Sequence, residues 1–307
     1  MPNTNNHKKI FKVALFADGP WSHNVLKKIL SEDLIEVSFV CGRYKTRDII
    51  LQELCSKHNL KFFRTKNINS REFLEKIRNF NCELFISMSF DQIFSEEIIE
   101  MPKYKIINCH AGKLPFYRGR NILNWALIND EKEFGITVHY VDKEIDTGDI
   151  ILQETFKIDD SDTYATLLKV AYVECANILF DAVRLFLRLS KIPRISQKTI
   201  HPLGFTCPKR KIGDELINWS SSSREIFNFV RALTHPGPLA TTFIEGNQVK
   251  IIAVKLIEKS PTYIGIPGAI LNNSIEGVDV KTGDSFIRIV DFNSVLDLKV
   301  GHRFESK

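Results

Sequence analysis

The sequence predicts an α/β domain built on a parallel sheet, followed by a small, mostly β domain. In the first two thirds of the chain, short apolar runs alternate with amphipathic segments, which is the pattern of a parallel sheet covered by helices. From about residue 201, prolines, glycines and polar residues become frequent and short β-type runs follow at close spacing. A chain of 307 residues is also long for one core. We therefore expect two domains, residues 1–205 and 206–307.

Strands and helices are expected to alternate along the first domain. Residues 11–16 form an apolar run typical of a buried strand, and the next segment places apolar residues four apart on one helical face. Asn69 with Glu72 can form a capping box, and Asp162 can cap a long final helix. The expected strands are 11–16, 35–41, 60–63, 84–88, 105–109, 135–141 and 150–156, and the expected helices are 22–30, 46–58, 69–79, 121–128 and 162–189.

The second domain is expected to be a small antiparallel barrel. Ser222 and Glu225 form a capping box for one short helix that runs through Ala232. Turn signals such as Glu245-Gly246-Asn247 and Thr282-Gly283-Asp284 separate short β-type runs. The expected strands are 241–244, 248–256, 268–271, 277–281 and 285–290.

Composition limits the protein class. A hydrophobic fraction of 44% and a charged fraction of 26% are those of globular proteins and argue against disorder or a coiled coil. No run approaches the roughly 20 apolar residues of a membrane helix, and residues 1–12 are polar and basic, so we expect a cytoplasmic protein. Six cysteines without close pairs indicate free thiols rather than a metal or redox motif. The sequence has a net charge of +5 but lacks the dense basic face that is expected of a nucleic-acid binder.

Two polar segments carry the candidate chemistry. Asn108 and His110 are two residues apart at the carboxyl end of an expected strand, so their side chains point the same way. In an open parallel sheet, ligands bind at that end of the strands. An amide there can stabilise an oxyanion, and an imidazole can exchange a proton with an amine. Alternatively, both side chains only form hydrogen bonds with backbone groups of the following loop. The simplest interpretation of the acidic segment 142–149 is a solvated turn. Alternatively, one of its carboxylates lies beside His110 and orients the ring for acid–base catalysis.

Together these segments resemble the folate-dependent formyltransferase family. That family carries an Asn-x-His at a strand end, a Leu-Pro-x-x-Arg-Gly loop and an Asp-Thr-Gly-Asp turn, in the order and spacing found here. The segment 217–220 is also similar to the family's linker into its carboxyl-terminal domain. The resemblance implies a Rossmann-like catalytic domain followed by an OB-like barrel. It further implies transfer of a formyl group from 10-formyltetrahydrofolate to a primary amine, with no metal, by Asn108, His110 and Asp146.

The resemblance also implies where the folate binds. The pterin is expected against the loop after the strand that precedes Asn-x-His and against the acidic loop, with backbone groups making much of the contact. For the Phe90 segment, simple core packing is the alternative. The implied cofactor-binding residues are Met88, Ser89, Phe90, Asp91, Gln92, Ile93, Val141, Asp142 and Ile145.

For the acceptor amine, we expect a nucleotide-linked amino sugar, on a dTDP carrier and for surface polysaccharide such as O-antigen, with methionyl-tRNA as the alternative. Family members that act in purine synthesis are similar to the first domain only. The tRNA enzymes carry a long basic insertion after the second strand, where this chain has only residues 41–47, and the loop 113–125 is more similar to the sugar enzymes. We accordingly expect a homodimer, a small-molecule substrate and no nucleic-acid or membrane partner.

The candidate substrate-binding residues lie in that loop. Two of its arginines can grip a diphosphate with forked donors, and an aromatic ring can stack on a sugar or base. For Trp125, core packing is a strong alternative. The candidates are Lys113, Tyr117, Arg118, Arg120, Asn121 and Trp125.

Other function classes fit less well. A dinucleotide-dependent oxidoreductase would need a Gly-x-Gly-x-x-Gly turn, which residues 17–22 lack. A hydrolase releasing formate from the same folate would bring a different regulatory domain at the amino terminus. A catalytically dead binding module stays open, because an intact set of catalytic residues shows capacity only.

Overall fold

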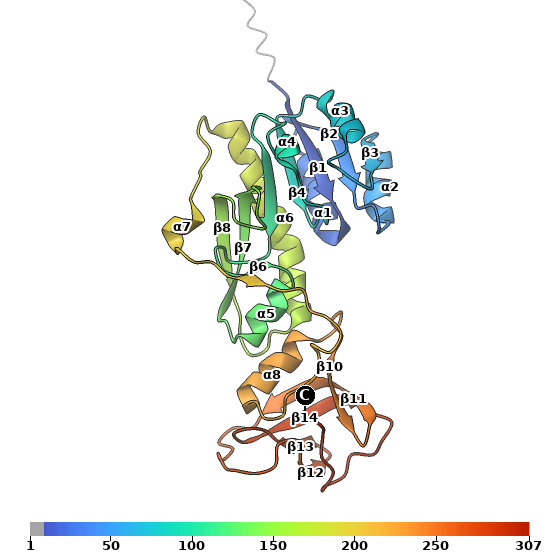
Figure 1. Ribbon diagram of the computed structural model, residues 1–307, viewed down its shortest axis with the longest axis vertical. Helices are drawn as coiled ribbons and strands as arrows, with labels where there is room; N and C mark the ends of the chain where they lie inside the picture. The colour runs from blue at the N-terminus through green and yellow to red at the C-terminus, as the bar shows by residue number, and fades with distance from the viewer. Residues whose placement is uncertain (1–8, 307) are drawn as a thin grey trace, which may run out of the picture. The chain divides into compact units, whose positions relative to one another are not determined.

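The computed structural model describes residues 9–306, so residues 1–8 of the polar amino-terminal start lie outside the described part (Figure 1). The chain forms two compact units. The first contains the chain up to Gly119 together with Gly135–Thr155 and Val170–Thr206, and the second contains Arg120–Phe134, Phe156–Lys169 and the chain from Cys207 onward. The domain division expected at residue 205 stays a prediction.

The first unit is built on a seven-stranded sheet in the order β3-β2-β1-β4-β5-β7-β8. The first five strands in this order pair in parallel, and β5 pairs with β7 in the antiparallel direction. This confirms the expected α/β class, with the later strands forming an edge beside β5. The strands are β1 Phe11–Ala17, β2 Ile35–Gly42, β3 Lys61–Arg64, β4 Leu84–Met88, β5 Ile106–His110, β7 Glu133–Tyr140 and β8 Ile150–Lys157.

Helices cover both faces of this sheet because strand side chains alternate between the faces. On one face, Phe16 and Phe85 join a core cluster with residues of α3 and α4. On the other face, Trp21 of α1 packs edge-on against Tyr172 of α6, with ring centroids 4.5 Å apart. The helices of this unit are α1 Gly19–Leu30, α2 Ile49–Lys57, α3 Arg71–Arg78, α4 Glu96–Ile99, α7 Gln197–Ile200 and the part of α6 Tyr164–Arg188 from Val170 onward. The helix α5 Ile122–Ile128 belongs to the second unit.

Two expected helix caps are wrong by one residue. Ser70, not Asn69, accepts the hydrogen bond from the Phe73 N–H at the start of α3. At the start of α6, Thr163 accepts from the N–H of Thr166, whereas Asp162 accepts from the hydroxyl of Thr166. Adjacent polar residues are equally competent caps in a sequence, and packing decides which one faces the helix.

The second unit contains a five-stranded antiparallel sheet in the order β10-β11-β14-β13-β12. Backbone bridges Phe243↔Glu305 and Ala269↔Arg303 connect β10 and the residue before β12 to one segment, residues 303–305, as expected for a small barrel. The buried Trp219 stacks on Phe304 in its core. The capping box of α8 Ser223–Ala232 is confirmed. The strands of this sheet are β10 Ala240–Ile244, β11 Asn247–Leu256, β12 Ile270–Ser274, β13 Gly277–Lys281 and β14 Phe286–Asn293. A further short pair, β6 Arg118–Gly119 with β9 Thr206–Cys207, belongs to the first unit except for Cys207.

The six cysteines are free thiols, as expected. Within residues 9–306, none of the helices combines the length and apolar character needed to cross a membrane.

Candidate active site

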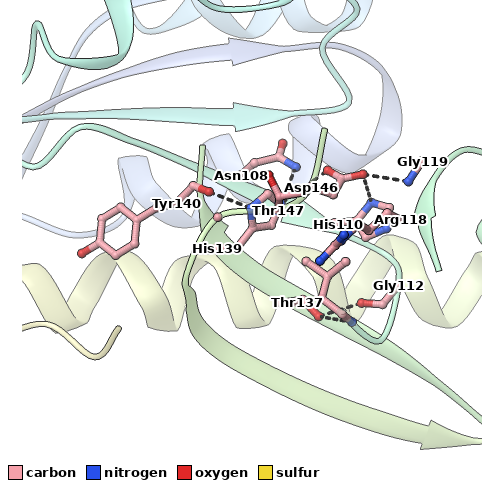
Figure 2. A network of polar contacts seen from close by, with 12 residues as sticks. Asn108, His110, Gly112, Arg118, Gly119, Thr137, His139, Tyr140, Asp146 and Thr147 are labelled. Atoms are coloured by element: carbon pink, nitrogen blue, oxygen red, sulfur yellow. Dashed lines mark hydrogen bonds and ion pairs between the residues drawn. The ribbon is translucent and has the colours of Figure 1, made fainter. Parts of the chain in front are cut away.

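His110 lies at the carboxyl end of β5, where it is 9% exposed. Figure 2 shows the ring facing Asp146. The Nε2 atom of His110 is 2.7 Å from the carbonyl oxygen of Tyr117. A carbonyl can only accept, so Nε2 carries a proton and donates it, and Nδ1 is left as the basic nitrogen of the neutral ring. Gly112 makes this contact possible, because a Cβ at this position would lie 2.4 Å from His110 Nε2 and 2.5 Å from the Tyr117 oxygen.

Asp146, in the acidic turn after β7, lies beside His110. Its Oδ2 is 3.6 Å from His110 Nδ1 and accepts a hydrogen bond of 2.9 Å from the Gly119 N–H. Burial alone would raise the pKa of the Asp146 carboxyl, but His110, His139 and the Gly119 N–H hold that pKa well below its ordinary range. The carboxylate is therefore ionised and faces the nitrogen of His110 that is free to take up a proton.

A second histidine, His139, completes the network, and sequence reasoning missed it. β5 and β7 pair in a register that places Asn108 directly opposite His139. Asn108 Nδ2 lies 3.2 Å from His139 Nε2, and His139 Nδ1 donates to the Tyr140 carbonyl at 2.8 Å. Asp146 Oδ1 is 3.5 Å from the same Nε2. The only signal in the sequence was a histidine within an expected strand, since nothing local indicates which residue lies across the sheet.

The loop after His110 is fixed by the buried Thr137 and the half-buried Gln153. Thr137 donates from its hydroxyl to the Gly112 carbonyl at 2.6 Å, and Gln153 Nε2 donates to the Leu114 carbonyl at 2.9 Å. Gln153 Nε2 also donates to the hydroxyl of Thr137 at 2.8 Å. These contacts attach residues 112–114 to strands β7 and β8, which holds the backbone around the His110 ring in one conformation.

The expected folate-binding loops lie close to each other. Phe90 and Val141 pack against the same core cluster, and Lys143 forms an ion pair with Glu96 at 3.2 Å. Phe90 also lies 5.5 Å from Phe16 between ring centroids, so its side chain does pack as a core residue. Ile93 and Ile145, one from each loop, remain 65% and 57% exposed, which is unusual for isoleucine.

The remaining expected folate residues have structural partners or are exposed. Met88 is buried, and Ser89 accepts a hydrogen bond from Arg43 at 3.1 Å. Gln92 accepts from the Ile68 N–H and donates to the Thr65 carbonyl, both at 3.0 Å. Asp91 and Asp142 are exposed, and Asp142 accepts from the hydroxyl of Thr147. Their folate-binding roles stay predictions.

The expected substrate residues divide between the two units. In the first unit, Lys113 is exposed, and Tyr117 is 7% exposed and packs its ring on Phe205. Arg118 donates twice to Gln197 Oε1, at 2.6 and 3.1 Å. Sequence reasoning also missed Gln197.

In the second unit, Arg120 is exposed, and Asn121 accepts from the Arg210 N–H at 3.0 Å. Trp125 is half-buried and donates from Nε1 to the Pro208 carbonyl at 3.1 Å. The substrate roles of these residues are untested predictions. Among residues 9–306, no group of three or more His, Cys, Asp or Glu side chains is arranged to hold a metal ion.

Comparison with known proteins identifies relatives along most of the chain. Residues 19–183 match the formyl transferase family and residues 210–294 match the formyl transferase carboxyl-terminal domain. The chain is 33% identical to a methionyl-tRNA formyltransferase of Fusobacterium nucleatum over 78% of this chain and 76% of that protein. It is 34% identical to that of Halothermothrix orenii over 87% of both chains.

A solved structure of a sugar 3N-formyl transferase, WlaRD, in the presence of dTDP and 5-N-formyl-tetrahydrofolate, is similar in fold. It superposes with a TM-score of 0.66 at 23% identity and covers 94% of this chain and 99% of that one. At this identity the likeness shows the fold alone.

The expectation of a nucleotide-linked sugar acceptor, with its dTDP and O-antigen context, is wrong. Curated relatives that match most of the chain at 30–34% identity are named methionyl-tRNA formyltransferases, and they also oppose the expectation of no nucleic-acid partner. The error came from the loops 41–47 and 113–125. Connecting loops vary in length and composition among homologues, so a short loop is weak evidence about the acceptor. The homodimer and the cytoplasmic location stay predictions.

Proposed function

This chain belongs to the formyltransferase family and is a formyltransferase, and we propose that it formylates the amino group of methionine carried by initiator tRNA. The observation that carries the proposal is the set of relatives of that name, whose similarity extends through both matched regions of the chain. The polar network of Asn108, His110, His139 and Asp146 supports the chemistry.

The proposed co-substrate is 10-formyltetrahydrofolate, which supplies the formyl group when it is bound. The two adjacent loops, residues 88–93 and 141–146, fit a pterin, because each presents an exposed isoleucine, Ile93 and Ile145, beside backbone groups. Apolar side chains that flank backbone donors and acceptors are the usual lining of a small-molecule site.

Proton transfer is assigned to His110. The Tyr117 carbonyl fixes the tautomer, so Nδ1 is the nitrogen that accepts a proton from the incoming amine. The 3.6 Å between Nδ1 and Asp146 Oδ2 is longer than a hydrogen bond, and it shortens once Nδ1 is protonated. Asp146 then stabilises the positive charge on the ring until the proton passes to N10 of the folate, whose bond to the formyl carbon breaks. This arrangement uses Asp146 as an orienting and stabilising carboxylate rather than as the base.

Stabilisation of negative charge is assigned to Asn108. Its Nδ2 carries two N–H groups, and one of them is directed to His139 Nε2. The second N–H is available to the oxygen that gains negative charge as the amine attacks. His139 therefore orients the donor, and its own tautomer is set by the Tyr140 carbonyl. Removing one such donor typically lowers turnover by 10²-fold or more.

The test is a transfer assay with 10-formyltetrahydrofolate and methionine-charged initiator tRNA, with product mass measured after deacylation. Formyl-methionine is the expected product, and its formation should weaken as salt rises, because tRNA phosphates are bound by electrostatic contacts. Uncharged tRNA and a panel of dTDP-linked amino sugars serve as comparison substrates. Transfer to an amino sugar without transfer to methionyl-tRNA would refute the proposal.

A further inference from the structure

One buried amide outside the catalytic set, Gln197, connects the Asp146 turn to the loop that carries Arg118. Gln197 is the first residue of α7 and is 3% exposed. Its Nε2 donates to the carbonyls of Asp146 and Gly148, both at 2.8 Å. Its Oε1 accepts the Nε and a terminal nitrogen of Arg118 at 3.1 and 2.6 Å. The amide thus uses both of its donors and both of its lone pairs.

Residues that precede Gln197 also contact the turn that carries Asp146 and the start of β8. Ile195 and Ile150 exchange two backbone hydrogen bonds, of 2.8 and 2.9 Å. Arg194 pairs with Asp149 at 3.3 Å, and its guanidinium lies 4.1 Å from the centroid of the Tyr140 ring. We name residues 194–197 the positioning strap. It holds the backbone from residue 146 to residue 150, although it lies about 50 residues later in the chain.

The turn needs such support because its conformation is constrained. Asp146 has a positive φ of 57°, in the left-handed region that a non-glycine residue adopts at some cost. Gly148 lies against the Tyr140 carbonyl so closely that a Cβ would be 1.8 Å from that oxygen. The two hydrogen bonds from Gln197 Nε2 fall on the carbonyls of these same two residues. A small shift there would move the Asp146 carboxylate away from His110 and His139.

We propose that Gln197 is a positioning residue, which sets the place of the Asp146 carboxylate beside His110 through the backbone of the turn. The inference rests on the proposed catalytic role of Asp146. Gln197 does not touch His110 or His139 in the described contacts, so its effect on catalysis passes through Asp146. Arg118, bound on the other side of the amide, fixes the orientation in which Gln197 Nε2 faces the turn.

The test is a double-mutant cycle with Gln197→Met, which keeps the length of the side chain and removes all four hydrogen bonds. We expect kcat to fall at least 10-fold in the wild-type background and less than threefold in an Asp146→Asn background, because the residue that Gln197 positions is already disabled there. Gln52→Met, on the outer helix α2, is the matched control and should leave kcat unchanged. An equal loss in both backgrounds, or wild-type kcat in Gln197→Met, would overturn the proposal.

A second measurement does not need the acceptor and so separates this inference from the proposed function. Carboxyl-carbon NMR can follow the ionisation of Asp146 directly, against His110 on β5 and His139 on β7, the titratable groups that face it. In the wild type the carboxyl should stay ionised throughout the folded range, whereas in Gln197→Met it should titrate within that range. Unchanged titration would overturn the positioning role. If Gln197→Met does not fold, Gln197→Glu replaces it, since it keeps the acceptor for Arg118.

Discussion

Replacing Asp146 by asparagine tests the centre of the proposed mechanism. The substitution preserves shape, and the amide oxygen can still accept the Gly119 N–H that now lies 2.9 Å from Oδ2. What is lost is the negative charge 3.6 Å from His110 Nδ1. With an effective dielectric constant of about 20, a protonated His110 and an ionised Asp146 at this distance attract by about 5 kcal/mol. If residual solvent halves this figure, the loss corresponds to roughly 10²-fold in rate.

The assay is single-turnover formyl transfer over a range of pH, with Glu154→Gln as control because Glu154 is an exposed carboxylate on β8, outside both proposed folate loops. Asp146→Asn should lower the rate by about 10²-fold or more and change the pH profile, because the proton on His110 loses its counter-charge. Glu154→Gln should do neither. A wild-type rate, or a slower rate with an unchanged profile, would show that Asp146 takes no part in handling the proton.

Three further outcomes follow from the same geometry. Asn108→Ala should lower kcat by at least 10²-fold with little change in melting temperature, since its half-buried amide serves the site rather than the core; near-wild-type turnover would contradict this. Gly148→Ala should lower both kcat and melting temperature, because its Cβ would lie 1.8 Å from the Tyr140 oxygen, and a variant that keeps both values would disprove the close approach. Hydrogen bonds from Arg224 lower the pKa of Asp130 to about 2 from its ordinary 3.8, so this carboxylate contributes stability above pH 3.8 that is lost as the pH falls toward 2. Thermal melts of Asp130→Asn should therefore depend less on pH in this window than those of the wild type.

Much of the fold could be predicted from sequence because its signals are local. Alternating apolar runs and amphipathic segments indicated the parallel sheet, and turn residues at close spacing indicated the antiparallel barrel. The direction of Asn108 and His110 followed from the two-residue period of a strand, which needs no tertiary information. The two errors in helix capping were also local, since Ser70 and Thr163 cap the helices where Asn69 and Asp162 were expected.

The candidate site depended on tertiary structure wherever its contacts are distant in the chain. His139 is 31 residues from Asn108 and meets it only through the antiparallel register of β5 and β7. Gln197 is 51 residues from Asp146 and reaches it only because the segment after α6 returns to the sheet edge. By itself, the sequence determined which side chains leave each strand on the same face. Which strands and loops lie opposite one another is decided by the free energy of burying the core. That free energy is summed over the whole domain, so no short segment of sequence determines the pairing.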